Sequence, residues 1–169
     1  MSILSKPELI QEIKKKRIKI TPFNIKNIGP ASIDLTLDNK FRIFSNSKKI
    51  FVASDKADYK KITKLITSKD IILNPQDTIL GITKEKISLP SDICGWLEGR
   101  SRFARIGLMV HISAPFMQPG INNKQVLEIS NMSHIPIKIK AGTKICQFIF
   151  QRVYGNAKYK GIFKNQTKL

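Results

Sequence analysis

Polar and apolar residues alternate along much of the chain, a period of two that is typical of β-strands. Residues 32–37 alternate strictly, so they are predicted to form a strand with one buried face. Aspartate and asparagine favour turns, so we expect Asp38-Asn39 to turn the chain into a second strand at residues 41–44.

Short apolar runs recur from residue 71 onward, separated by pairs that contain proline or glycine. Many short strands at such spacing, with one convincing helix, indicate an all-β barrel or jelly roll. No repeat, linker or second domain interrupts the pattern, so residues 1–153 are predicted to form one domain. The predicted strands lie at residues 71–73, 78–83, 93–97, 109–113, 124–131, 135–139 and 145–153.

A short helix is predicted near the N-terminus, at about residues 6–16. Ser5 can cap this helix, Glu8 would complete a capping box, and Pro7 lies in the first turn, where it loses no needed hydrogen bond. An apolar stripe that begins at Leu9 would face the core.

Two segments have a less definite pattern. Within residues 45–69, residues 50–53 favour a strand and residues 58–66 have helical spacing, but the whole segment could equally be an exposed excursion. Residues 154–169 are polar and lysine-rich, and they are predicted to form a mobile C-terminal tail.

The composition fits a globular protein. A chain of 169 residues with 41 % apolar residues can bury a substantial core. No window approaches the roughly 18 apolar residues of a membrane span, and the first 20 residues lack the apolar block of a secretory signal. Cys94 and Cys146 each follow an isoleucine, so we expect two reduced core residues in a cytoplasmic protein without a membrane partner.

The formal net charge is +18, from 30 Lys and Arg against 12 Asp and Glu. Such an excess is typical of proteins that bind nucleic acid, but here the lysines are spread from Lys6 to Lys168 without a dense tract. The pattern therefore favours a solvated, lysine-rich surface over a nucleic-acid interface. Its positive field would still attract polyanions such as nucleoside triphosphates.

Three of the six arginines in the chain are Arg100, Arg102 and Arg105. A guanidinium group can donate two parallel hydrogen bonds to a phosphate, so this cluster predicts a phosphate-binding segment. A solvated loop, or an ion pair such as Glu98 with Arg100, is the alternative.

Glu128 lies downstream in a strand-like run, where Val126 and Ser130 would share its face. It is either a sheltered catalytic carboxylate or an ordinary strand glutamate that is exposed or ion-paired. His111 is predicted to be a core histidine without a chemical role.

A set of motifs extends over most of the chain: residues 29–35 (GPASIDL), 99–101 (GRS), 105–108 (RIGL), 111–114 (HISA), 119–120 (PG), 126–128 (VLE), 141–147 (AGTKICQ) and 157–159 (AKY). This set resembles the dCTP deaminase family, within the dUTPase-like superfamily. The resemblance runs from about residue 1 to about residue 161, and no single motif carries it alone.

The resemblance implies a distorted jelly-roll, or dUTPase-like β-barrel, that forms a homotrimer with active sites at the subunit boundaries. The substrate would be dCTP, hydrolysed to dUTP and ammonia, with dUTP and dTTP as further candidate ligands. Glu128 would move protons, Ser101 and Arg105 would assist it, and the tail would close over the nucleotide. The implied nucleotide-binding residues are Arg100, Ser101, Arg102, Phe103, Ala104, Arg105, Ala114, Gln118, Val126, Leu127, Glu128, Tyr154, Lys158 and Gln166.

Zinc-dependent nucleobase deaminases need a His-x-Glu motif and a Pro-Cys-x-x-Cys motif. Cys94 and Cys146 are 52 residues apart, and neither His111 nor His134 has a Cys-x-x-Cys partner, so we expect no zinc. Mg²⁺ would instead accompany the phosphates of the nucleotide. Without a metal at the reacting carbon, a shielded carboxylate would have to take a proton from water and give one to the amine.

The chain departs from the family pattern at four places. Arg102 replaces the second serine of an Arg-Ser-Ser run, Phe116 replaces an arginine, Gln118 replaces an aspartate, and Ile162 stands where a tail glutamine is expected, which leaves Gln166 as an alternative register. Glutamine can hydrogen-bond a deoxyribose hydroxyl but cannot act as a base.

These departures bear on three rival interpretations. A dUTPase, or a bifunctional deaminase that continues to dUMP, would use the aspartate that Gln118 replaces to activate water. A trimeric nucleotide-binding protein that has lost turnover would be compatible with Arg102 and Gln118. A basic nucleic-acid binder is disfavoured, because no basic stripe is interleaved with aromatic residues.

Overall fold

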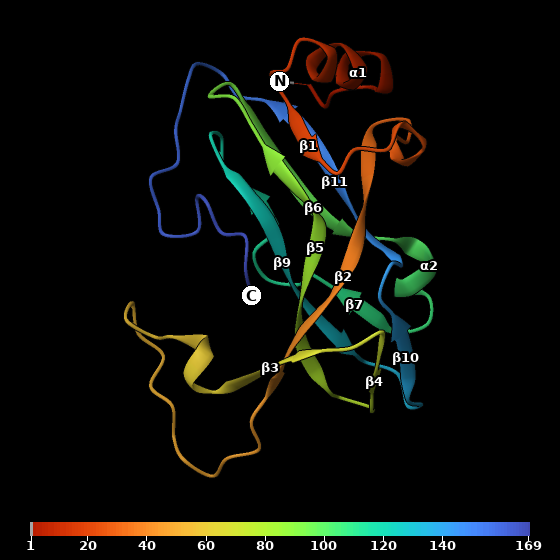
Figure 1. The fold of residues 1–169 in the computed structure, drawn as a ribbon, viewed down its shortest axis with the longest axis vertical. Helices are drawn as coiled ribbons and strands as arrows, with labels where there is room; N and C mark the ends of the chain where they lie inside the picture. Colours follow the sequence, from red (N-terminus) through yellow and green to blue (C-terminus); the bar gives the residue numbers. More distant parts are fainter. Residues whose placement is uncertain (1) are drawn as a thin grey trace.

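The fold is built almost entirely from antiparallel strands, as predicted (Figure 1). The computed structural model describes residues 2–169. Its strands are β1 (Lys19–Thr21), β2 (Ser32–Phe44), β3 (Thr63–Thr67), β4 (Asp70–Leu73), β5 (Thr78–Ser88), β6 (Ile93–Gly99), β7 (Leu108–Val110), β8 (Phe116–Met117), β9 (Asn122–Asn131), β10 (Ile137–Lys140) and β11 (Lys144–Arg152).

Nine of these strands form one large curved sheet in the order β7-β9-β5-β2-β11-β6-β8, with β1 beside β5 and β3 beside β2. The other two, β4 and β10, pair with each other. The sheet curls around a core of leucine, isoleucine and phenylalanine side chains. Gly95 on β6 lies directly against the ring of Phe148 on β11, so the two strands pack at a point where no larger side chain has room.

The predicted turn at Asp38-Asn39 is wrong, because β2 runs without a break from Ser32 to Phe44. The register of β2 against β5 is irregular between Leu37 and Phe41, and this irregularity accommodates the two turn-forming residues within the strand. The Asp38 side chain accepts hydrogen bonds from the Asn39 backbone N–H (2.8 Å) and from Lys124 (3.0 Å). The predicted buried face is confirmed, since Ile33 and its alternating apolar neighbours are fully buried.

Residues 58–66 do not form the helix that their spacing suggests. A single 3-10 turn, η2 (Tyr59–Lys61), leads directly into β3, which pairs with residues 40–44 of β2. The backbone N–H and C=O groups of β3 are paired with those of β2, and the spacing of apolar residues within the segment does not reveal this long-range partner. Residues 50–53 form no strand, and Ile50 is 95 % exposed. Of the two alternatives predicted for these residues, the exposed excursion is therefore the one observed.

Helix α1 (Lys6–Lys14) ends two residues before the predicted end. Ser5 occupies the N-cap position, but its side chain makes no capping hydrogen bond, so the predicted capping box is not formed. Glu12, at 4 % exposure, anchors the helix through Arg17 (2.7 Å) and Arg152 on β11 (2.8 Å). Burial by itself would raise the pKa of Glu12, but the hydrogen bonds from the two arginines hold that pKa below its ordinary value.

The C-terminal tail lies against the domain along β9. The backbone N–H groups of Asn122 and Lys124 donate to the carbonyl groups of Lys164 and Gln166, both at 2.8 Å. Leu169 is 5 % exposed and packs with Leu80 and Ile82 of β5. Figure 1 shows the tail in blue, beside the face of β9.

Within residues 2–169, no helix is long and apolar enough to cross a bilayer. Cys94 and Cys146 are free and buried, as predicted, and burial raises the pKa of both thiols.

Candidate functional site

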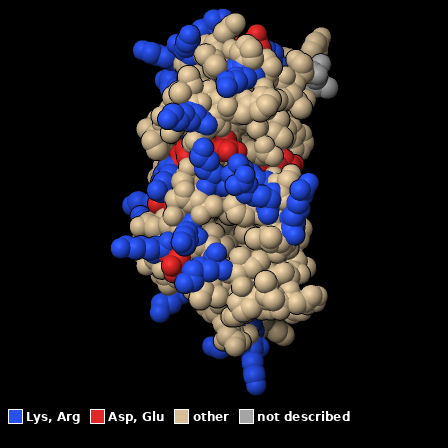
Figure 2. Space-filling model, turned by 90° about the vertical axis from the view of Figure 1, so that its right-hand side faces the viewer, with Lys and Arg blue, Asp and Glu red and all other residues tan. Residues whose placement is uncertain are grey.

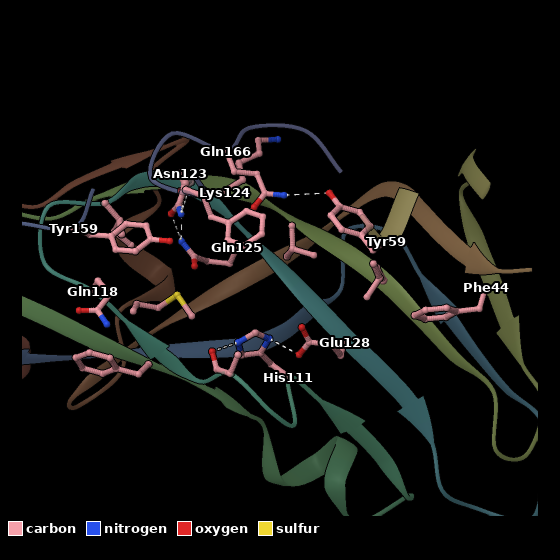
Figure 3. Close-up of a pocket in the computed structure, with 17 residues that line it drawn as sticks. Phe44, Tyr59, His111, Gln118, Asn123, Lys124, Gln125, Glu128, Tyr159 and Gln166 are labelled. Carbon is pink, nitrogen blue, oxygen red and sulfur yellow. Dashed lines mark hydrogen bonds and ion pairs between the residues drawn. The ribbon is translucent and has the colours of Figure 1, made fainter. Parts of the chain in front are cut away.

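A pocket of about 480 Å³ lies between β9, the segment that follows β7, and the tail (Figure 3). Its wall is mainly apolar and aromatic, with a few polar groups, a composition that suits a small organic ligand. The lining residues are Phe44, Tyr59, Leu80, His111, Ala114, Phe116, Met117, Gln118, Ile121, Asn123, Lys124, Gln125, Val126, Glu128, Tyr159, Phe163 and Gln166. Among them are five of the residues predicted from the sequence: Ala114, Gln118, Val126, Glu128 and Gln166.

Glu128 projects from β9 into this pocket, and its side chain is 31 % exposed. The predicted alternation along the strand is confirmed, because Leu127 and Ile129 are fully buried in the core while Val126 shares the pocket with Glu128. Leu127 therefore does not line the pocket with its side chain. The acid is neither free in bulk solvent nor neutralised by a lysine or arginine of its own chain within the described residues.

His111 lies beside Glu128 in the pocket, and the sequence predicted no chemical role for it. Its backbone N–H donates to the Glu128 carbonyl oxygen at 2.7 Å, an extension of the β7–β9 pairing. Its backbone has a positive φ of 58°, which is uncommon for residues other than glycine, although histidine adopts it more often than most. This conformation turns the ring toward the carboxylate, and the side chain is 4 % exposed.

The surroundings of His111 determine its tautomer. Nε2 lies 2.8 Å from the Ala114 carbonyl oxygen, and a carbonyl can only accept, so Nε2 carries a proton. Nδ1 lies 3.0 Å from Glu128 Oε2, although the two atoms are out of hydrogen-bond alignment and neither has another partner in residues 2–169. A bare Nδ1 would repel a carboxylate oxygen at this distance, so the pair is satisfied only when a proton lies between the two atoms.

The tail forms one wall of the pocket. Tyr159, Phe163 and Gln166 line it, and the Gln166 amide lies 3.4 Å from the hydroxyl of Tyr59, which comes from the excursion at residues 45–62. Ile162 is 89 % exposed and does not line the pocket, whereas Gln166 does.

Two other predicted tail residues lie outside the pocket. Tyr154 is 97 % exposed, and Lys158 is also exposed. Sequence patterns offered no signal for Tyr59, since it lies in an excursion whose course depends on β3 pairing with β2.

The arginine cluster lies away from this pocket in the same chain. Helix α2 (Ser101–Ala104), a single turn that was not predicted, carries Ser101, Arg102, Phe103 and Ala104. None of residues 100–105 lines the pocket. In Figure 1, α2 is on the side of the sheet opposite the tail.

Within the cluster the arginines differ. Arg100 binds the Lys144 carbonyl oxygen (2.8 Å) and Asp34 (3.1 Å), so its ion-pair partner is Asp34 and not Glu98. Arg105, like Arg102, is exposed and pairs with no acid among the described residues. Figure 2 shows the face on the α2 side, where Lys and Arg side chains are dispersed, with a denser group across the middle.

The lysine in the pocket is neutralised locally. Lys124 Nζ lies 3.0 Å from Asp38 Oδ2. Burial would raise the pKa of Asp38, but Lys124 and the Asn39 N–H hold it below its ordinary value. Within residues 2–169 no three His, Cys, Asp or Glu side chains lie close enough together to hold a metal ion.

Comparisons with known proteins agree with this architecture. The family model for the dCTP deaminase-like domain matches residues 3–153. A protein of Leifsonia xyli named dCTP deaminase, dUMP-forming, is 36 % identical over 173 residues, covering 97 % of this chain and 86 % of that protein.

Solved structures show the same fold. The crystal structure of 2'-deoxycytidine 5'-triphosphate deaminase from Agrobacterium tumefaciens aligns with a TM-score of 0.70 and 19 % identity over 90 % of this chain, which spans only about half (48 %) of that longer chain. A dUTPase of Staphylococcus bacteriophage 80alpha aligns with a TM-score of 0.50 and 14 % identity, over 86 % of this chain and 96 % of that chain. The chain belongs to the dCTP deaminase-like family.

Proposed function

We propose that the protein is a dCTP deaminase, which hydrolyses the amino group at C4 of the cytosine to give dUTP and ammonia. The observation that carries this proposal is Glu128, which lies in an apolar pocket with His111 as its close partner. The naming of the Leifsonia relative supports the same reaction class.

Glu128 would act as base and then as acid. It takes a proton from water while the oxygen adds to C4, and passes this proton to the ring nitrogen N3. Glu128 then takes the second proton from the new C4 hydroxyl and gives it to the amino group, the C4–N bond breaks, and ammonia leaves as the C4 carbonyl forms. The proton between Glu128 and His111 would keep the carboxylate oriented during this exchange, because His111 is itself held by the Ala114 carbonyl.

The site would be completed by a second copy of the chain. Ser101 and Arg105 are exposed on α2, away from the pocket of their own chain. In a closed homotrimer each α2 can face the pocket of a neighbour, so that Ser101 helps to place the water while Arg105 and Arg102 approach the phosphates.

The remaining contacts would come from the chain that holds Glu128. Val126 and the backbone at Ala114 would contact the base, Gln118 is available to the sugar, and the tail would close through Gln166. The pocket offers Glu128 as its sole carboxylate, a donor set that does not fit a resident Mg²⁺ site. The ion would therefore arrive on the triphosphate of the substrate.

A second candidate is the bifunctional reaction that continues to dUMP and pyrophosphate, because the Leifsonia relative is named dUMP-forming. Against it, Gln118 lines the pocket at the position where we expect an aspartate to activate water. We infer that dUTP is the main product.

Incubation of the purified protein with dCTP and Mg²⁺, with ammonia and all nucleotides quantified, tests these alternatives together. Stoichiometric ammonia and dUTP would support the proposal. A dominant dUMP peak would select the bifunctional enzyme. Tight dCTP binding without ammonia would instead indicate a nucleotide-binding protein that has lost turnover.

A further inference from the structure

Two buried side-chain amides in the wall of the pocket have no part in the mechanism above. Asn123 is 7 % exposed and Gln125 is 2 % exposed, and both lie on β9, near the tail. Buried amides are costly unless their donors and acceptors are matched, so their hydrogen bonds determine how each amide is oriented.

The tail determines how the Asn123 amide is oriented. Asn123 lies 2.8 Å from the Phe163 backbone carbonyl, which can only accept, so Asn123 must present its NH₂ group there. Its Oδ1 therefore faces Gln125 at 2.8 Å, and Gln125 must present its own NH₂ group to that oxygen. The backbone of Gln125 is held as well, since its N–H donates to the Thr83 hydroxyl at 3.0 Å.

This relay leaves the Oε1 atom of Gln125 as an acceptor on the side away from Asn123, as Figure 3 shows. No donor within residues 2–169 hydrogen-bonds to it. Gln125 is therefore a nearly buried residue whose one unused polar atom faces the cavity.

We propose that Gln125 Oε1 accepts a hydrogen bond from the sugar hydroxyl of the bound 2′-deoxynucleotide, and so helps to determine substrate specificity. This inference rests on the proposed function, because Glu128 places the reacting C4 of the base. Gln125 is three residues from Glu128, roughly 10 Å along an extended strand. The amino group is bonded to C4 and cannot reach so far, whereas the sugar lies on the opposite side of the ring and carries a hydroxyl donor.

The relay also couples recognition to the tail. Phe163 belongs to the tail, and without its carbonyl oxygen both amides could rotate by half a turn, which would present a donor to the pocket instead of an acceptor. Recognition of the hydroxyl is therefore expected only when the tail lies along β9.

The test is a double-mutant cycle between protein and ligand. Binding of dCTP and of the analogue that lacks the 3′-hydroxyl is measured by calorimetry for the wild type, for Gln125→Met and, as a matched control, for Gln11→Met, because Gln11 is exposed on α1 outside the pocket. Methionine keeps the length of the side chain but has no amide. The wild type should bind the analogue roughly tenfold more weakly, Gln125→Met should bind both within about twofold, and Gln11→Met should keep the preference.

Two results would overturn the inference: a wild type that binds both nucleotides equally, or a preference that survives in Gln125→Met. Thermal unfolding checks the variants, and Gln125→Leu, which also has no amide, should likewise lose the preference if methionine prevents folding. Ammonia release separates this inference from the proposed function. A preference for dCTP over the analogue without ammonia release would contradict only the proposed deamination. Ammonia release without this preference would contradict only the role of Gln125.

Discussion

Replacement of Glu128 by glutamine separates the chemistry of the pocket from its shape. In the wild type, Oε2 lies 3.0 Å from His111 Nδ1, and the His111 Nε2 proton is committed to the Ala114 carbonyl. A glutamine can donate its amide N–H to the bare Nδ1 of a neutral imidazole. The variant therefore keeps a satisfied pair but has no group that can accept a proton from water.

The expected magnitudes differ strongly for rate and stability. Loss of a general base slows a reaction by roughly 10²–10⁴-fold, which corresponds to about 3–5 kcal/mol in the activation free energy. The substitution keeps the shape of the side chain and its contact with His111, so it should change the free energy of unfolding by less than about 1 kcal/mol. The Tm should accordingly stay within about 4 °C of the wild type.

Single-turnover ammonia release measures the rate, and calorimetry measures the Kd for dCTP. Glu98→Gln is the matched control, because Glu98 is an exposed strand glutamate of β6 outside the pocket. We expect Glu98→Gln to behave as the wild type, and Glu128→Gln to bind dCTP without turnover. Turnover within tenfold of the wild type in Glu128→Gln would refute the role of Glu128 as the base.

Three further predictions address the assembly, the core and the anchoring of α1. Arg105→Ala chains and Glu128→Gln chains should each be inactive alone, but should regain about a quarter of wild-type activity when refolded together in equal amounts. In such a mixture about one site in four combines an intact Glu128 from one chain with an intact Arg105 from its neighbour. No recovery of activity would argue against a site shared between chains. Gly95→Ala should lower the Tm by about 5 °C or prevent folding, as seen by circular dichroism, because the added methyl group would overlap the Phe148 ring. Glu12→Gln should reduce the free energy of unfolding by about 2 kcal/mol at neutral pH. Folding lowers the pKa of Glu12, so the stabilisation by the Glu12 carboxylate is present above its ordinary pKa of 4.5 and is lost as the pH falls through the lower pKa of the folded protein. The denaturant unfolding curves of the wild type and Glu12→Gln should therefore converge at that low pH.

The local pattern was sufficient for the class of fold and for the direction of individual side chains. Strict alternation placed Ile33 in the core, and it placed Glu128 on the face opposite Leu127, because successive side chains on a strand point to opposite sides. The same alternation could not show that residues 38–39 stay within β2, since a bulge depends on the partner strand.

Long-range pairing decided the rest of the site. Residues 58–66 have helical spacing, but residues 63–66 join β3, because β2 offers an edge to pair with, and this pairing brings Tyr59 to the pocket. The tail carries no hydrophobic period of its own, and its course is determined by backbone hydrogen bonds with β9.

The sequence by itself determined that the fold consists of β-strands, that the chain resembles its family, and that a carboxylate, Glu128, lies on an inner strand. Only the tertiary structure placed His111 against that carboxylate, brought Gln125 and the tail into one hydrogen-bond relay, and put α2 on the opposite side of the chain. The physical reason is that alternation and turn chemistry act over a few residues, whereas a site is assembled by contacts between strands that are distant in sequence and whose register no local pattern specifies.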